Sequence, residues 1–201
     1  MLDRAATRLI KPVVTRLAKG LQRAGLSANQ ITLGGFLIGL LAAFLIAIEY
    51  YAAGAIALLT SRLCDALDGA VARLTQATDV GGFLDIALDF LFYASIPLAF
   101  ALADPARNAL PAAVLLAAFI GTGSSFLAFA VIAAQRGLHS VNYPDKSFYF
   151  LGGLTEATET LACFGAMCFW PMQFPALAYG FAALCGITTL TRLWWGWRSF
   201  S

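Results

Sequence analysis

The chain has 201 residues, of which 60% are hydrophobic and only 12% are charged. That charged fraction is about half the average of soluble proteins, and the mean hydropathy is +0.78. The composition therefore excludes an ordinary soluble domain and predicts one polytopic membrane domain, residues 1–201. The formal net charge of +2 gives no reason to expect a nucleic-acid partner.

Residues 1–25 are predicted to form an amphipathic helix that lies on the membrane surface. Six basic residues alternate there with apolar residues that recur at roughly helical spacing. Such a helix buries its apolar face at the interface and turns its basic face to the lipid headgroups. The basic residues continue to Arg23 and no cleavage site follows an apolar core, so this segment does not resemble a cleavable signal peptide.

The remaining residues, 26–201, are predicted to be all-α and to form a bundle of six transmembrane helices. Their apolar runs are continuous and long enough to span a bilayer. Ser27 and Asn29 are both candidate caps of the first span. The expected spans are about 31–49, 52–75, 80–103, 109–134, 148–170 and 174–195.

The stretch from Arg62 to Asp89 is unusual because it holds five of the eleven acidic residues between two apolar segments. Carboxylates at membrane depth are costly unless they are compensated. Asp65 and Asp68 are three residues apart, and Asp85 and Asp89 are four apart, so on helices each pair lies on one face. If the two helices face each other, four carboxylates converge, which indicates a functional site.

Four like charges repel strongly in a low dielectric, so either some stay protonated or cations lie between them. Carboxylate oxygens suit Mg²⁺, Mn²⁺ or Ca²⁺ rather than zinc. Two divalent ions would balance four aspartates and could bind a diphosphate. Gly69 lets a ligand approach the helix backbone, and Arg73 could hold phosphate oxygens. Arg62 is interpreted as the ion-pair partner of Asp65 within the same helix.

Two further carboxylates, Glu156 and Glu159, are expected roughly two turns into the fifth span, with threonines around them. Carboxylates at that depth again indicate function. The alternative is that they pair internally with Arg62 or Lys146. The loop before this span provides two cations, Arg136 and Lys146.

Six spans place both termini on one side of the membrane. Eleven of the thirteen Lys and Arg lie in the termini, the turn after the second span and the loop 135–146. The positive-inside rule therefore predicts that the termini and the aspartates face the cytoplasm. An interfacial anchor is expected at the end of the last span, formed by Arg192, Trp194, Trp195, Trp197 and Arg198.

The aspartate-rich stretch resembles the signature of the CDP-alcohol phosphotransferases. The matching run is Asp65-x2-Asp68-Gly69-x2-Ala72-Arg73, followed by Gly81-x3-Asp85-x3-Asp89. One feature departs from the commonest form, because seven residues separate Arg73 from Gly81 where eight is usual. We interpret this as a shorter connecting loop. The resemblance covers nearly the whole chain and extends to small bacterial inner-membrane members of the family, through N-Q-I-T at 29–32 and G-G-L-T-E at 152–156.

The resemblance implies an enzyme that transfers a phosphatidyl group from a CDP-alcohol, expected to be CDP-diacylglycerol, to an acceptor alcohol and releases CMP. It implies a homodimer in the inner membrane and two Mg²⁺ or Mn²⁺ ions. The implied metal ligands are Asp65, Asp68, Asp85 and Asp89, with Asp89 also acting as the catalytic base. The implied CDP-binding residues are Asp65, Asp68, Gly69, Arg73 and Asn29.

The acceptor is not fixed by the resemblance. Arg136 and Lys146 would suit a phosphorylated acceptor, whereas Glu156 and Glu159 would suit an amine or a neutral polyol. We assign all four residues to the acceptor pocket as a hypothesis.

Three other interpretations compete with the enzyme. A cation transporter would use the carboxylates as an ion site, but it needs polar residues on both sides of the membrane. An intramembrane prenyltransferase would have two well-separated aspartate motifs, whereas here the four aspartates lie within residues 65–89. A non-catalytic scaffold of the same family would not explain why four aspartates are kept at their desolvation cost.

Overall fold

The computed structural model describes the backbone of residues 2–137 and 154–201, and the side chains of that part from residue 10 onward. This part of the chain is helical and contains no strand, as the sequence predicts. In chain order its elements are α1 (Leu2–Arg23), α2 (Ala28–Ala47), α3 (Tyr51–Leu74), α4 (Asp79–Ala103), α5 (Pro105–Gln135), α6 (Ala157–Phe169), the 3₁₀ turn η1 (Pro171–Gln173) and α7 (Phe174–Phe200).

The predicted spans other than the fifth correspond closely to α2, α3, α4, α5 and α7, although α7 continues past Trp195 to Phe200. Ser27, rather than Asn29, caps α2. Its Oγ accepts a hydrogen bond from the Gln30 amide at 3.3 Å, and Oε1 of Gln30 accepts one from the Ser27 amide at 3.0 Å. This reciprocal capping box satisfies amide groups that would otherwise be left unbonded at the helix start.

The fifth span is shorter than the sequence predicts. A helix was expected over 148–170, but in the described residues it begins at Ala157 and ends at Phe169. Its 13 residues cover about 20 Å, which is less than the roughly 30 Å of a bilayer core. The expected residues 148–153 lie outside the described part of the chain.

In the described part of the chain, four stretches are long and apolar enough to cross a membrane. They are Ala28–Ala47, Asp79–Ala103, Pro105–Gln135 and Pro171–Phe200. The helix α3 has sufficient length, with 24 residues, but it contains the charged motif. Large apolar side chains such as Leu37 and Ile120 point outward from these helices, which suits contact with lipid.

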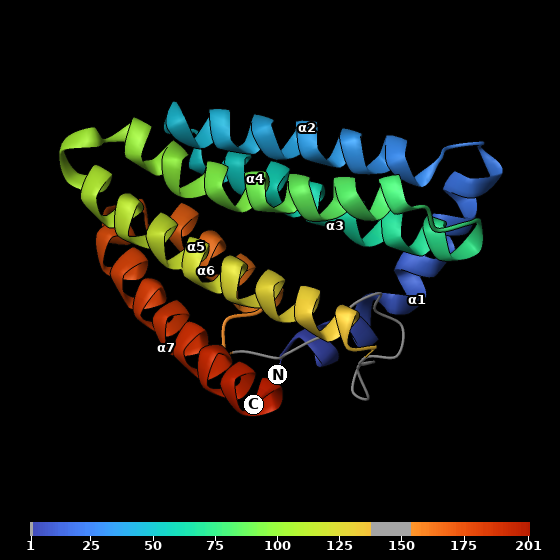
Figure 1. The fold of residues 1–201 in the computed structure, drawn as a ribbon. Coiled ribbons are helices and arrows are strands. Elements are labelled where there is room, and N and C mark those ends of the chain that lie inside the picture. Colours follow the sequence, from blue (N-terminus) through green and yellow to red (C-terminus); the bar gives the residue numbers. More distant parts are fainter. Residues whose placement is uncertain (1, 138–153) are drawn as a thin grey trace.

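The helices α2, α3 and α4 pack together, and α5 packs against both α4 and α7 (Figure 1). The helix α1 lies at the end of this bundle where α3 ends, and Gln22 Nε2 donates a 3.4 Å hydrogen bond to the Leu74 carbonyl oxygen. Val14 and Ala18 of α1 are buried in a small apolar cluster with Ile31, Leu67, Ala70 and Val71.

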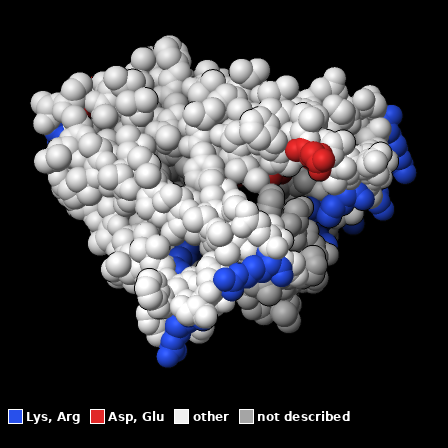
Figure 2. Space-filling model, in the orientation of Figure 1, with Lys and Arg blue, Asp and Glu red and all other residues white. Residues whose placement is uncertain are grey.

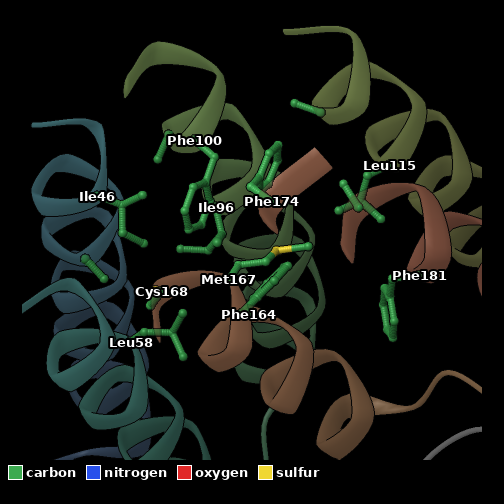
Figure 3. Packing of buried hydrophobic residues seen from close by; sticks show 14 of the residues in the cluster. Ile46, Leu58, Ile96, Phe100, Leu115, Phe164, Met167, Cys168, Phe174 and Phe181 are labelled. Carbon is green, nitrogen blue, oxygen red and sulfur yellow. The ribbon is translucent and has the colours of Figure 1, made fainter. Parts of the chain in front are cut away.

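A larger apolar core fills the other half of the bundle, where side chains from α2 to α7 meet (Figure 3). The rings of Phe100 and Phe174 stack there with centroids 4.6 Å apart. Along α3, Arg62 and Asp65 lie between Leu58 of this core and Leu67 of the smaller cluster, and Asp68 follows Leu67 directly. The polar site therefore lies between two apolar clusters that fix the helices on both sides of it.

Close packing of α2 on its neighbours depends on glycine. A Cβ on Gly35 would lie 2.7 Å from the Cβ of Cys64, and a Cβ on Gly39 would lie 2.6 Å from a ring carbon of Phe92. Both distances are too short for real contacts, so only glycine fits at these two positions. Gly34, in contrast, has no heavy atom within 4 Å of an added Cβ.

Candidate metal centre and adjoining cavity

The turn between α3 and α4 brings the two halves of the aspartate motif together. The helix α3 ends at Leu74 and α4 begins at Asp79, so a turn of four residues returns the chain antiparallel. Thr78 caps α4, since its Oγ1 accepts a hydrogen bond from the Gly81 amide at 3.1 Å. Asp79 is the first residue of the helix and is exposed, which excludes the capping role that its position in the turn suggests.

Three of the four predicted carboxylates converge. One carboxylate oxygen from each of Asp65, Asp68 and Asp85 lies within 4.8 Å of the other two. We call these three residues the carboxylate triplet. Asp68 is only 5% exposed, and its Oδ2 is buried without a hydrogen-bond partner. A buried carboxylate oxygen without a donor, beside two more carboxylates, is unfavourable unless a cation is bound. This donor set fits a hard divalent ion.

Asp89 lies one turn after Asp85 but is not a member of the triplet. Its Oδ1 accepts a hydrogen bond from Arg62 Nη1 at 2.5 Å, between α3 and α4. The same nitrogen is 3.5 Å from Oδ1 of Asp65, which confirms the predicted ion pair within α3. The sequence did not reveal the shorter pair with Asp89, because that contact depends on how the two helices pack.

A narrow cavity of about 10 Å³ lies among these residues. That is about the space of one water-sized sphere, which is suited to an ion rather than to a lipid headgroup. Its lining residues are Thr32, Gly35, Phe36, Ser61, Arg62, Asp65, Asp68, Asp85, Leu88 and Asp89.

The predicted nucleotide-binding residues lie near the same end of the bundle. Gly69 follows Asp68 directly, and Nη1 of Arg73 is 3.4 Å from the position that a Cβ on Gly69 would take. Arg73 is exposed. Oδ1 of Asn29 is 3.0 Å from the position of a Cβ on Gly81, so Asn29 lies against the start of α4. Gly69, Arg73 and Asn29 are not among the residues that line the narrow cavity.

A second cavity of about 630 Å³ lies next to the first, between α4, α5, the start of α6 and α7. Its volume is typical of sites for small organic ligands. Asp89 lines both cavities. Most of the other walls are apolar, and the polar lining residues besides Asp89 are Tyr93, Thr122, Thr155, Glu156, Thr160, Cys185 and Arg192.

Glu156 and Glu159 are not two turns inside a helix, as the sequence analysis expected. Glu156 is the N-cap of α6, and its amide donates a 3.2 Å hydrogen bond to Oε2 of Glu159. The two glutamates form a capping box, which places them at the helix start. Only Glu156 lines the large cavity. The alternative was that the two glutamates pair with Arg62 or Lys146, but the ion pairs of Arg62 are with Asp65 and Asp89.

Of the two cations assigned to the acceptor, Arg136 lies in the described part of the chain. Nη2 of Arg136 donates a 2.9 Å hydrogen bond to the Phe200 carbonyl oxygen, and its guanidinium lies over the Phe200 ring. Arg136 lines neither cavity. Lys146 lies outside the described residues.

Arg192 is a cavity residue that the sequence analysis placed wrongly in the interfacial anchor. It is only 8% exposed and lines the large cavity, and its Nε is buried without a hydrogen-bond partner. The sequence feature that could have identified Arg192 as an inward-facing residue is its helical spacing from two other residues of α7. Arg192 follows Thr188 by four residues and Cys185 by seven, and both are buried, so all three lie on the inward face of α7.

Figure 2 shows that the charged side chains are unevenly distributed over the face drawn there. Most of this face is uncharged. Lys and Arg gather along its lower and right-hand parts, which is the region where α1 and the chain ends lie in Figure 1.

Residues 26–195 match the family model described as CDP-alcohol phosphatidyltransferase. The inner membrane protein YnjF of Escherichia coli strain K12 is 50% identical over 197 residues, which cover 98% of this chain and 96% of that protein. An archaetidylinositol phosphate synthase of Pyrococcus horikoshii is 39% identical over 99 residues, which cover 49% of this chain and 53% of that protein.

Two solved structures of one enzyme share this fold. The phosphatidylinositol phosphate synthase of Mycobacterium tuberculosis, in complex with manganese and citrate, matches with a TM-score of 0.71 and 24% identity over 92% of this chain and 88% of that one. The structure of the same enzyme with CDP-DAG bound matches with a TM-score of 0.69, also at 24% identity, over 92% of this chain and 94% of that one. At this identity the match shows a shared fold.

Proposed function

Because the chain belongs to the CDP-alcohol phosphatidyltransferase family, we propose that it transfers a phosphatidyl group from CDP-diacylglycerol, or another CDP-alcohol, to an acceptor alcohol and releases CMP. The observation that supports this most strongly is that the carboxylate triplet lies beside a cavity of substrate size. Asp89 lines both this large cavity and the narrow cavity at the triplet. A single domain of residues 1–201 would contain the whole site.

The triplet Asp65, Asp68 and Asp85 would hold Mg²⁺ or Mn²⁺. The unbonded buried oxygen of Asp68 supports this assignment, as does the fold shared with a manganese complex. A divalent ion held there would neutralise charge on the donor diphosphate and stabilise the leaving CMP. Asp89, which lines the same narrow cavity, is proposed to complete the ligand set for two such ions.

Gly69, Arg73 and Asn29 are proposed to bind the CDP part of the donor together with Asp65 and Asp68. Gly69 leaves the α3 backbone open to a phosphate, and the exposed Arg73 guanidinium beside it can donate to phosphate oxygens. Asn29, in the first turn of α2, lies against Gly81 at the start of α4. The structure with CDP-DAG bound supports this class of donor.

Asp89 is proposed as the general base. A base must lie within hydrogen-bond reach of the hydroxyl whose proton it takes. Asp89 lies at the border of the metal site and the large cavity, so a hydroxyl that enters from the cavity would meet its carboxylate before it reaches the donor phosphate. The proton of that hydroxyl would move to the Asp89 carboxylate.

The large cavity is proposed to take the acceptor. Arg192 provides a planar cation inside it, which suits a phosphate group on the acceptor. Relatives named for inositol phosphate lipids support a phosphorylated polyol. Glu156, which also lines the cavity, would accept hydrogen bonds from acceptor hydroxyls. This placement gives Arg192 the role that the sequence analysis gave to Arg136 and Lys146.

We further propose an inner-membrane protein with six membrane-crossing segments and α1 at the interface. The name of the Escherichia coli relative supports the location. The sequence distribution of Lys and Arg supports an orientation with both termini and the aspartates towards the cytoplasm. A homodimer, implied by the family, is part of the same proposal.

The experiment that tests this function is CMP release by the purified protein in detergent with CDP-diacylglycerol and Mg²⁺ or Mn²⁺. The acceptor panel would be glycerol phosphate, inositol phosphate, inositol, serine, choline, ethanolamine and glycerol. We expect release that depends on a phosphorylated acceptor and is lost in Asp89→Asn. No release with any acceptor, together with no binding of CDP-diacylglycerol, would contradict the proposal.

A further inference from the structure

The helix α1 turns a row of large apolar side chains to the outside of the protein. Ile10, Val13 and Leu17 are 46%, 57% and 45% exposed. Their spacing of three and four residues places them on one face of the helix. An exposed apolar row on a helix that lies beside membrane-spanning segments is typical of contact with lipid rather than with water.

A basic groove lies on another face of the same helix. Lys11, Thr15 and Lys19 follow one another at intervals of four residues, so they share a face, and Arg16 lies beside them. Together with Pro12 they line an open groove of about 380 Å³, which we call the basic groove. Its three cations are exposed, and none is ion-paired within the described part of the chain. Figure 2 shows Lys and Arg side chains gathered in the region of α1.

The third face of α1 packs on the helix that carries Asp68. Val14 and Ala18 are buried in a small apolar cluster with residues of α3 that include Leu67 and Val71. Leu67 directly precedes Asp68, and Val71 lies one turn further along α3. The position of α1 therefore affects the part of α3 that carries the buried carboxylate of the triplet.

The apolar row and the basic groove together indicate the chemistry of their partner. A neutral bilayer would cover the apolar row and leave the cations without a counter-charge. A nucleic acid or an acidic protein segment would neutralise the cations and leave the apolar row in water. An anionic phospholipid satisfies both, because its phosphate lies near the cations when the apolar row enters the acyl-chain region.

We propose that the basic groove of α1 binds the headgroup of an anionic phospholipid, and that the bound lipid holds α1 against α3 and so raises the turnover of the site. The part about turnover rests on the proposed function. The small apolar cluster and the hydrogen bond from Gln22 to Leu74 fasten α1 to the bundle. A further contact with the membrane surface makes α1 cover Leu67 and Val71 more firmly. An ordinary interfacial helix needs no particular headgroup, so a headgroup preference distinguishes the two.

Binding is measured by native mass spectrometry of the purified protein in detergent, with equal amounts of phosphatidylglycerol and phosphatidylcholine that carry the same acyl chains. The wild type should retain phosphatidylglycerol in preference. In Lys11→Gln/Lys19→Gln the preference should fall at least about tenfold, because each cation near an anionic lipid surface contributes roughly fivefold in affinity. Lys11→Arg/Lys19→Arg keeps the charges and should keep the preference. So should Arg198→Gln, which removes a cation that packs on Trp194 of α7.

Turnover is measured as the kcat of CMP release in proteoliposomes with a constant, saturating fraction of CDP-diacylglycerol. The wild type should turn over several-fold faster in membranes that contain phosphatidylglycerol than in phosphatidylcholine alone, and added salt should reduce this difference by screening. Lys11→Gln/Lys19→Gln should lose the rise. Val14→Ala should keep the lipid preference but show a smaller rise, because it weakens the contact of α1 with α3 and leaves the groove unchanged.

Equal retention of the two lipids by the wild type would overturn the inference, and so would a preference that survives in Lys11→Gln/Lys19→Gln. A rise in the donor KM of that variant with no change in lipid preference would assign the groove to the CDP-alcohol instead. The same kcat in both membranes would overturn the coupling of α1 to the site. If the wild type releases no CMP in any membrane, the proposed function fails and the part about turnover with it. The lipid preference alone then decides whether the groove binds an anionic headgroup.

Discussion

Nη1 of Arg192 on α7 donates a 2.9 Å hydrogen bond to the carbonyl oxygen of Thr122 on α5. This bond uses one end of the guanidinium to join two walls of the large cavity. It leaves Nε without a hydrogen-bond partner inside the protein. An arginine bound in this way is held against a wall and still has a donor available, which is what a phosphate-binding residue requires.

Arg192→Gln should therefore raise the KM of a phosphorylated acceptor about tenfold or more, while the KM of the CDP-alcohol donor changes little. The physical reason is the loss of a charge-assisted hydrogen bond to the acceptor phosphate. Steady-state kinetics with each substrate varied in turn would measure the two constants. Arg198→Gln is the matched control, since Arg198 lies on the same helix but packs on Trp194 outside the cavity. Equal changes in both KM values would contradict the assignment.

Asp68→Asn should weaken Mn²⁺ binding and reduce turnover by about a hundredfold or more. Asp68 is the buried member of the triplet, and its Oδ2, which has no hydrogen-bond partner, is the oxygen that we propose as a metal ligand. In the wild type, Mn²⁺ should raise the melting temperature, because a ligand of the folded state stabilises it. That rise should be lost in Asp68→Asn and kept in Asp79→Asn, whose carboxylate is exposed at the start of α4.

Alanine substitutions of Glu156 and Glu159 should affect stability and KM differently, although both residues cap the same helix. Glu159→Ala removes the acceptor of the Glu156 amide, so we expect a loss of about 1 kcal/mol in stability with little effect on either KM. Glu156→Ala also removes a group that lines the large cavity, so it should raise the acceptor KM much more than the donor KM. Melting curves and kinetics on both variants would separate the two roles. An unchanged acceptor KM in Glu156→Ala would rule out a place in the acceptor pocket.

Gly39→Ala should destabilise the protein by about 1–3 kcal/mol. Its added Cβ would meet the Phe92 ring at 2.6 Å and Oγ of Ser61 at 2.9 Å, and these are two groups that hold Arg62. Gly34→Ala is the control on the same helix, because nothing lies within 4 Å of its added Cβ. That substitution should be neutral or stabilising by up to about 1 kcal/mol. Thermal unfolding in detergent would measure both, and similar melting temperatures for the two variants would contradict the packing described here.

The sequence predicted the features that repeat along one helix or follow from local chemistry. The apolar runs gave α2, α3, α4 and α5 to within a few residues, and the spacing of Asp65, Asp68 and Asp85 predicted their convergence. Ser27 and Asn29 were both recognised as candidate caps because serine and asparagine side chains accept hydrogen bonds from the first amides of a helix.

The features that the sequence did not predict depend on contacts between helices or on where a helix begins. Arg192 was placed at the interface because it is close in sequence to three tryptophans. The helix α7 in fact continues past it to Phe200, and Arg192 lies on the buried face of that helix. The Glu156 pair was placed inside a helix because apolar and small residues precede it, yet the capping box starts the helix there. The Arg62–Asp89 pair joins two helices, so spacing along either one could not reveal it.

The central claim is tested most directly by counting products in proteoliposomes made with CDP-diacylglycerol, Mn²⁺ and a phosphorylated polyol. Mass spectrometry would quantify the new phospholipid, and a nucleotide assay would quantify CMP. The account predicts one new phospholipid for each CMP in the wild type, and neither product in Asp89→Asn or Asp68→Asn. CMP without a new lipid would show hydrolysis of the donor rather than transfer, and product formation that persists in both variants would contradict the site described here.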